Sequence, residues 1–286
     1  MNRPVAVIAA LRMRDWVKNT LVLVPALVAG RVADPAMLTA TAYAFLAFGL
    51  AASSAYVLND ICDRDTDRHH PAKRHRPFAM GTLPIATGVL LVPLLLSLAI
   101  AVARPLLPPV FISALGAYVA LSVVYSLCIK RIAFADIVLL AGLYTMRVVG
   151  GAVACSLPVS PWLVACSLSG FVSLASLKRY AELQVLATGI TRAPGRPYGI
   201  PDRALLQWIG VVAGGLCVLI LILSRGTAWM PWVRAATGAC LVYWMARSWF
   251  LARHGRMGAD PLAFAVKDPD SYAVGAVVAA ALFGRG

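Results

Sequence analysis

The chain has 286 residues, of which 60% are hydrophobic and 13% charged, with a formal net charge of +14 and a mean hydropathy of +0.79. This composition excludes a disordered chain, which needs low hydrophobicity and high charge, and an ordinary soluble domain, in which about a quarter of the residues are charged. A membrane span needs roughly 20 mostly apolar residues, so the remaining class is a polytopic membrane protein.

Nine apolar runs follow one another along the chain and predict an all-α membrane helical bundle. They are Val17–Gly30, Met37–Leu58, Ile85–Ala103, Leu106–Leu127, Phe134–Ala154, Pro161–Leu177, Leu205–Leu223, Ala228–Leu251 and Tyr272–Phe283. Residues 1–16 lack the features of a signal peptide, so we expect them to form an interfacial segment. We expect 1–286 to be one transmembrane domain, with long polar loops at 59–84 and 178–203.

Alternate loops differ strongly in charge. The amino terminus and the loops after spans two, four, six and eight carry most of the 26 Lys and Arg residues, so the positive-inside bias places them in the cytoplasm. All acidic residues but Asp34 lie on that side or at its membrane edge. We therefore expect an integral protein of the inner membrane whose active site faces the cytoplasm. Charges that fall between spans do not form a basic domain, which argues against nucleic acid as a partner.

The loop after span two begins with four metal-ligand side chains. Asn59 and Asp60 end the apolar run, and Asp63 and Asp67 follow three and seven residues after Asp60. On a helix these three carboxylates share one face, where they repel one another unless a cation lies among them. Hard oxygen ligands suit Mg²⁺, which completes its shell with water and substrate phosphates.

A basic run follows the carboxylates at Lys73, Arg74 and Arg76. A carboxylate–metal cluster beside Lys and Arg is what a diphosphate leaving group needs, because the metal and the basic side chains neutralise its oxygens. The alternative is a solvated acidic loop with interspersed basic residues.

Further polar residues lie at the edges of the spans or within them. Arg147 lies midway along span five, where a charge is expensive and usually faces the interior. It either contacts a substrate phosphate or forms a buried structural pair. Lys18 either contacts substrate, with Asn19, or extends along the membrane edge. Lys130 is either an anchor on the positive side or part of the site.

The segment N-D-x-x-D-x-x-x-D, followed by K-x-x-R-P and a glycine, resembles the UbiA superfamily of intramembrane prenyltransferases. The resemblance extends over the whole chain. It implies a helical bundle around a central cavity open to lipid. It also implies Mg²⁺ held by the first motif, here Asn59, Asp60, Asp63 and Asp67.

Other segments resemble the decaprenyl-phosphate phosphoribosyltransferase branch of this superfamily. They are R-M-R-D-W-V-K-N at 12–19, Y-S-L-C-I-K-R-I-A-F-A-D at 125–136, and K-R-Y-A-E-L at 178–183. Most of the superfamily has a second aspartate-rich motif in the third polar loop, where this chain has Lys178, Arg179 and Glu182. The branch implies transfer of a 5-phosphoribosyl group from phosphoribosyl diphosphate (PRPP) to a polyprenyl (decaprenyl) phosphate, for cell-wall arabinan precursors.

The resemblance assigns roles residue by residue. Asp60, Asp63 and Asp67 are the expected catalytic and metal-binding residues. The expected substrate contacts are Lys18, Asn19, Asn59, Lys73, Arg76, Tyr125, Lys130, Asp136, Arg147, Lys178, Arg179, Tyr180 and Glu182. Glu182 is expected to contact a second metal or the ribose.

Two other functions share some of these features. A prenyltransferase acting on an aromatic or other small acceptor would share the first motif, although the missing second aspartate-rich motif counts against it. A transporter or non-catalytic lipid-binding protein would differ in having its ionisable residues at mid-membrane. The expected partners are the lipid bilayer, a polyprenyl phosphate and PRPP. A homo-oligomer is compatible with the sequence.

Overall fold

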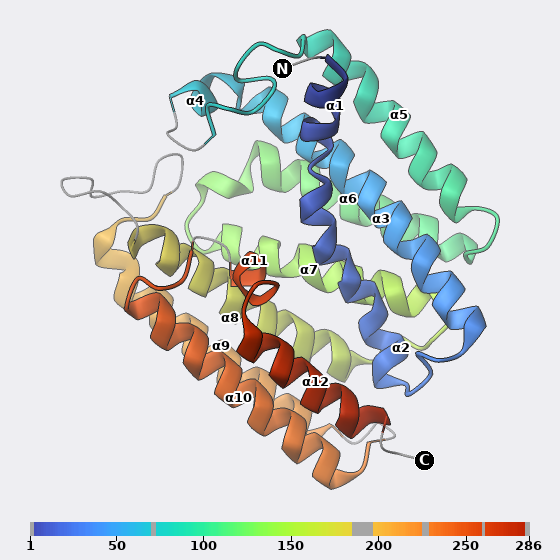
Figure 1. Cartoon of the computed structure of the whole chain (residues 1–286), viewed down its shortest axis with the longest axis vertical. Helices are drawn as coiled ribbons and strands as arrows, with labels where there is room; N and C mark the ends of the chain where they lie inside the picture. Colours follow the sequence, from blue (N-terminus) through green and yellow to red (C-terminus); the bar gives the residue numbers. More distant parts are fainter. Residues whose placement is uncertain (1–2, 70–72, 185–196, 225–228, 259–260, 284–286) are drawn as a thin grey trace. The chain divides into compact units, whose positions relative to one another are not determined.

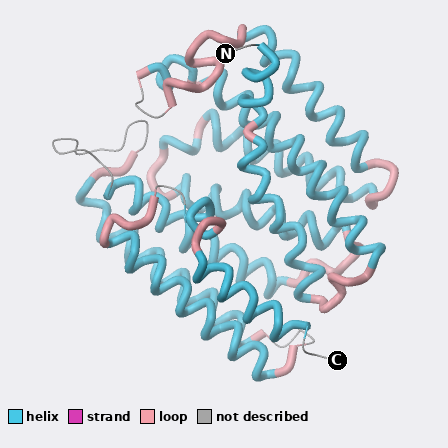
Figure 2. Tube along the Cα trace, in the orientation of Figure 1, coloured by secondary structure: helices cyan, strands magenta, loops and turns pink. Residues whose placement is uncertain are grey.

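A computed structural model of the chain describes residues 3–69, 73–184, 197–224, 229–258 and 261–283. The regular elements in these ranges are helices, joined by loops and turns (Figures 1 and 2). The expected all-α class is therefore confirmed. The chain divides into two compact units, which are described separately. Unit 1 comprises residues 1–25, 33–130 and 146–158, and unit 2 comprises residues 26–32, 131–145 and 159–286.

Unit 1 is built on the long helix α3 (Pro35–Cys62). Asp34 caps this helix by accepting the N–H of Ala36, and Pro35 occupies a first-turn position where its missing N–H costs nothing. Four elements pack on α3: α1 (Arg3–Leu11), η1 (Met13–Leu23), α5 (Ile85–Ala103) and α6 (Pro109–Leu127). The short elements α4 (Arg64–Arg68) and η2 (Ile129–Arg131) follow the ends of α3 and α6.

A small apolar core fixes the end of the first polar loop within unit 1. Phe78 and Leu83 are buried together with Ala6 and Ala10 of α1, Val57 of α3 and Leu95 of α5. A Cβ atom on Gly88 would lie 2.9 Å from the Phe78 ring, so the glycine lets α5 approach this core closely. The loop that carries the basic run is thus anchored by a buried aromatic side chain.

The first expected span, Val17–Gly30, is not one α-helix. It consists of the 3₁₀-helix η1 and the short α2 (Val24–Val28). A 3₁₀-helix rises about 2.0 Å per residue and rarely exceeds four residues. The 11 residues of η1 are held against α3, because Trp16 donates to Ser53 at 3.0 Å and packs where Gly49 has no side chain.

Unit 2 consists mainly of four helices, α8 (Pro161–Gln184), α9 (Arg203–Leu223), α10 (Pro231–Arg253) and α12 (Pro269–Phe283), with the short η3 (Ile200–Asp202) and α11 (Pro261–Ala265). Helices α8 and α9 approach each other closely at small residues. A Cβ atom on Gly210 would lie 2.1 Å from Trp249 and 3.2 Å from Ser176. Helix α7 (Ala135–Ala154) contributes residues 135–145 to unit 2 and 146–154 to unit 1.

Six of the described helical segments are long and apolar enough to cross a membrane. They are Pro35–Cys62, Ile85–Ala103, Pro109–Leu127, Ala135–Ala154, Pro161–Gln184 and Ile200–Leu223. The expected number of nine is not confirmed. Among the remaining three, η1 and α2 divide the first run and α12 has only 15 residues. Helix α10 has 23 residues but includes Arg234 and Arg247, and it is not among the six candidates.

Candidate active site

The end of α3 carries the first group of predicted site residues. Asn59 and Asp60 occupy its last turn, the helix ends at Cys62, and Asp63 stands between α3 and α4. Asp67 belongs to α4. The expectation of one shared face holds for Asp60 and Asp67, which meet at the same nitrogen of Arg76. Asp63, at the turn between α3 and α4, pairs with Lys130 instead. Asp65 points away, with a side chain that is 75% exposed, as expected from its spacing.

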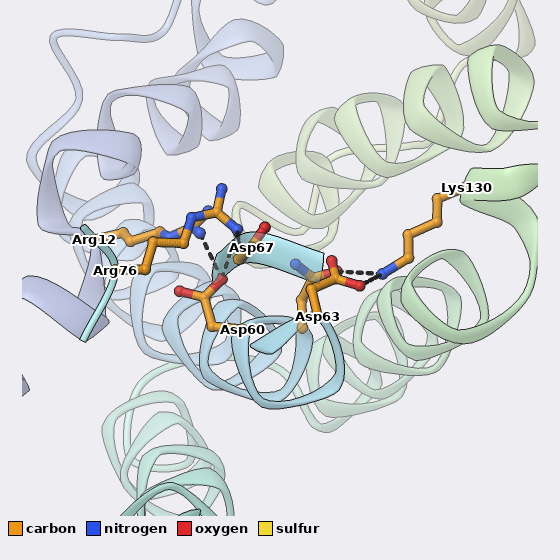
Figure 3. Close-up of polar contacts among 7 residues, drawn as sticks. Arg12, Asp60, Asp63, Asp67, Arg76 and Lys130 are labelled. Carbon is orange, nitrogen blue, oxygen red and sulfur yellow. Dashed lines mark hydrogen bonds and ion pairs between the residues drawn. The ribbon is translucent and has the colours of Figure 1, made fainter. Parts of the chain in front are cut away.

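Each of the three carboxylates is paired with a basic side chain (Figure 3). Arg12 and Arg76 donate to Asp60 at 2.6 and 3.2 Å, and the same nitrogen of Arg76 donates to Asp67 at 2.6 Å. We call this group of six residues the charged cluster: Arg12, Asp60, Asp63, Asp67, Arg76 and Lys130. All six belong to unit 1.

Lys130 completes the charged cluster from the other side of the α3 terminus (Figure 3). Its ammonium group lies 2.5 Å from a carboxylate oxygen of Asp63 and 3.2 Å from the amide oxygen of Asn59. The side chains of Asp60 and Asp67 are only 1% and 3% exposed. Buried charges without a counter-ion are very unfavourable, so each of these carboxylates depends on its basic partners for charge compensation.

The donor chemistry of this segment fits Mg²⁺. Three carboxylates and the amide oxygen of Asn59 are hard oxygen ligands, the type that Mg²⁺ binds. Among the described residues, no group of three or more His, Cys, Asp or Glu side chains is arranged to hold a metal ion. In this structure basic side chains supply the positive charge to all three carboxylates.

Lys73 is half-buried, and its carbonyl accepts the backbone N–H of Arg76.

A second polar group in unit 1 surrounds Arg147. The guanidinium donates to Asn19 and to the hydroxyl of Tyr118, each at 2.8 Å, and lies 4.8 Å from the centre of the Tyr118 ring. All three residues are buried, and the side-chain nitrogen of Asn19 has no hydrogen-bond partner. Gly151 allows this part of α7 to approach η1, because a Cβ atom there would lie 2.1 Å from the Val22 carbonyl.

The structure gives the nearby Lys18 a local partner. Lys18 lies 2.6 Å from Asp15, and both belong to η1. Tyr125 is half-buried near the end of α6. Sequence reasoning missed Arg12 and Tyr118 as members of these groups. Arg12 is the first residue of the R-M-R-D-W-V-K-N segment, so its position carried a signal. Tyr118 lies inside an apolar run, where a tyrosine carries no signal of its own.

Unit 2 holds a third polar group at the start of α7 and the end of α8. Arg179 donates to Asp136 at 2.7 Å and to Glu182 at 2.7 Å, and its side chain is 1% exposed. Tyr198 donates a hydrogen bond to Asp136 and accepts the backbone N–H of Phe134 at 2.7 Å. Burial, and then the hydrogen bond to Asp136, raise the pKa of Tyr198 above its usual range. The hydroxyl therefore stays protonated.

The structure shows contacts on both sides of residues 185–196 of the third polar loop. Arg203 donates to the carbonyl of Leu183, and Tyr198 contacts Asp136. Residues 185–196, with Arg192 and Arg196, lie outside the described residues. Lys178 is half-buried, and Tyr180 is buried against the ring of Trp249. Tyr198 was missed because no pattern links it to a residue 62 positions earlier.

Residues 20–265 match the family model described as the UbiA prenyltransferase family. The chain belongs to the UbiA prenyltransferase family. Its fold agrees with this assignment. A solved structure of a UbiA homolog from Archaeoglobus fulgidus bound to GPP and Mg²⁺ is similar over 97% of this chain and 96% of the homolog. The TM-score is 0.70 and the sequence identity is 16%. A chain with this family assignment and six apolar helices is an integral membrane protein.

Three curated relatives are similar in sequence. The nodulation protein NoeC of Azorhizobium caulinodans is 38% identical over 92% of this chain and 87% of its own length. The uncharacterized protein y4nM of Sinorhizobium fredii is 34% identical over 96% of this chain, which spans 54% of that relative. The decaprenyl-phosphate phosphoribosyltransferase of Mycobacterium tuberculosis is 36% identical over 64% of this chain and 62% of its own length. The expected resemblance to the phosphoribosyltransferase branch is confirmed.

Proposed function

We propose that the chain transfers a 5-phosphoribosyl group from PRPP to a polyprenyl phosphate and releases diphosphate. The observation that carries this proposal is that Asp60, Asp63, Asp67, Asp136 and Glu182 are all paired with Lys or Arg side chains. In such a reaction both substrates are anionic, so basic side chains must accompany the carboxylates. Similarity to decaprenyl-phosphate phosphoribosyltransferases supports the same donor and acceptor.

Within unit 1 we assign Asn59, Asp60, Asp63 and Asp67 to Mg²⁺, which when bound supplies positive charge to the diphosphate leaving group. Arg76 and Lys73 bind the phosphates of that group. Lys130, which contacts Asp63 and Asn59 in the structure, is a further contact to the diphosphate. Arg147 and Asn19 bind a second phosphate, with Lys18 and Tyr125 as further substrate contacts.

Within unit 2 we assign Lys178, Tyr180 and Glu182 to contacts with substrate. Arg179 and Asp136 act as positioning residues, because both are fully buried and paired with each other. Arg179 also holds the carboxylate of Glu182.

The reaction forms one bond and breaks one. An oxygen of the acceptor phosphate bonds to C1 of the ribose as the C1–O bond to diphosphate breaks, and the electron pair leaves with the diphosphate. The acceptor oxygen is already ionised at neutral pH and has no proton to lose. The protein therefore needs no general base and acts by positioning and charge stabilisation.

Diphosphate release by the purified protein in detergent tests the proposal. We expect release only when Mg²⁺, PRPP and decaprenyl phosphate are all present, and its loss when any of them is omitted. Turnover of a prenyl diphosphate with an aromatic acceptor, and none with PRPP, would favour the second candidate, a UbiA-type transfer to a small acceptor. That candidate is supported by the family assignment.

We also propose an orientation in the inner membrane with the charged cluster on the cytoplasmic side. The excess of Lys and Arg in the loops that contain this cluster supports it. A water-soluble donor such as PRPP would then reach the site from the cytoplasm.

A further inference from the structure

The charged cluster is neutral without any metal. Its three carboxylates, Asp60, Asp63 and Asp67, face three cations, Arg12, Arg76 and Lys130, at 2.5–3.2 Å. Two of the carboxylates are almost fully buried, and the cations that pair with them, Arg12 and Arg76, lie outside the helices α3 and α4 that carry these carboxylates. Such an arrangement is balanced as it stands, so a metal or an anion arriving alone would disturb it.

The consequences differ for the two components of a metal–diphosphate pair. Mg²⁺ alone must displace the cations from the carboxylates and leave them without a counter-ion. Diphosphate alone must draw the cations away and leave buried carboxylates unpaired. When both arrive, the metal takes over the carboxylates while the released cations bind the phosphate oxygens. Each charged group then faces a partner of opposite sign.

Arg12 is well placed for this exchange. Its side chain is 22% exposed and reaches Asp60 from the junction of α1 and η1. Its backbone has φ 49° and ψ 47°, a left-handed conformation that is uncommon for residues other than glycine. Strained backbone at a charged side chain is typical of functional positions, where the surrounding structure maintains it.

We propose that Arg12 is a further diphosphate-binding residue, held on Asp60 until the metal arrives, and that the site therefore binds metal and diphosphate together and neither alone. This inference rests on the proposed function, because it assumes that the charged cluster is the metal–diphosphate site. In this exchange Arg12 and Arg76 leave Asp60, and Lys130 leaves Asp63.

Equilibrium dialysis of the purified protein in detergent tests this inference without turnover. Two probes are used, radioactive Mn²⁺ in place of Mg²⁺ and ³²P-labelled inorganic diphosphate, each alone and then together. For the wild type we expect one of each bound per chain when both are present. With either probe alone we expect at least tenfold weaker retention.

The variant Arg12→Gln should change the two components in opposite directions. Asp60 loses one of its two cations, so Mn²⁺ alone should bind at least tenfold more tightly than to the wild type. Diphosphate in the presence of Mn²⁺ should bind about tenfold more weakly. A purely structural role for Arg12 would weaken both. Arg64→Gln is the matched control, because Arg64 pairs with the exposed Asp65 outside the charged cluster.

Two results would overturn the inference. Binding of Mn²⁺ alone to the wild type, with an affinity that diphosphate does not change, would remove the exchange and leave the proposed function intact. No binding of the Mn²⁺–diphosphate pair would remove both. If Arg12→Gln does not fold, Lys130→Gln should show the same opposite shifts through Asp63, and parallel losses in that variant would count against the exchange.

Discussion

At the scale of single residues, ion pairing decides what each carboxylate can do. Asp60 and Asp67 are buried and share Arg76, whereas Asp65 is exposed and pairs with its neighbours Arg64 and Arg68. Four aspartates within eight positions therefore have different chemistry. The spacing indicated that Asp60 and Asp67 point the same way, but the pairing depends on residues 9 to 67 positions away.

We expect Asp63→Ala to lower diphosphate release at least about 100-fold, a loss typical of removing a group that stabilises developing charge. The substitution removes one proposed metal ligand and leaves Lys130 without its carboxylate. Asp65→Ala is the control and should stay within about twofold of the wild type, since exposed ion pairs contribute little. Equal losses in both variants would contradict the assignment.

Tyr198 shows how a buried hydroxyl supports a carboxylate. We expect Tyr198→Phe to lower the free energy of unfolding by about 2 kcal/mol, because a hydrogen bond to a charged group is lost. The pKa of Tyr198 is raised in the folded protein. The protonated hydroxyl therefore contributes its full stabilisation of the folded state below pH 10, and this contribution is lost as the pH rises through the pKa of Tyr198 in the folded protein.

Thermal unfolding in detergent between pH 7 and pH 11 measures both effects. Above pH 10 the wild type should lose stability more steeply than Tyr198→Phe, which has no hydroxyl to ionise at this position. Parallel curves for the two proteins would show that Tyr198 is not held protonated by its surroundings.

At the scale of secondary structure, apolar runs predicted helices well where they were uniform. The runs 85–103 and 161–177 became α5 and the greater part of α8. The prediction failed at Val17–Gly30, where the chain forms η1 and α2 instead of one helix. Periodicity cannot distinguish a long 3₁₀-helix, since this form depends on tertiary contacts such as Trp16 with Ser53.

We expect Gly210→Val to destabilise unit 2 by roughly 1–3 kcal/mol, the usual cost of overpacking a close helix contact. A side chain there would meet Trp249, which itself packs on Tyr180. Gly215→Val is a matched control on the same helix, because a Cβ atom at Gly215 has no neighbour within 4 Å. Thermal unfolding of both variants compares them, and equal midpoints would contradict the close packing of α9.

At the scale of the whole molecule, the charge pattern is the basis of the proposed membrane orientation. Five residues of the charged cluster lie at or after the ends of α3 and α6, Arg12 lies between α1 and η1, and the loops that contain the cluster are rich in Lys and Arg. Composition and hydropathy were sufficient to predict an all-helical membrane protein. The division into two units could not be predicted from the sequence, because both units combine segments that are far apart in the chain.

The proposed orientation predicts which vesicles expose the native thiols Cys62 and Cys128, both of which are exposed on the protein and adjacent to the charged cluster. A membrane-impermeant maleimide should label the protein in inside-out vesicles and leave right-side-out vesicles unlabelled. The Cys62→Ser, Cys128→Ser double variant should remove this labelling. Labelling confined to right-side-out vesicles would reverse the orientation.

The central claim is that a phosphoribosyl group moves to a lipid phosphate while diphosphate leaves. The most direct measurement uses PRPP labelled with ³²P either at the 5-phosphate or at the β-phosphate, incubated with the protein, Mg²⁺ and decaprenyl phosphate, followed by solvent partition. We predict that the 5-phosphate label enters the lipid phase and the β-phosphate label stays in water as diphosphate. Both labels remaining in water, while a prenyl diphosphate is consumed with an aromatic acceptor, would contradict the account.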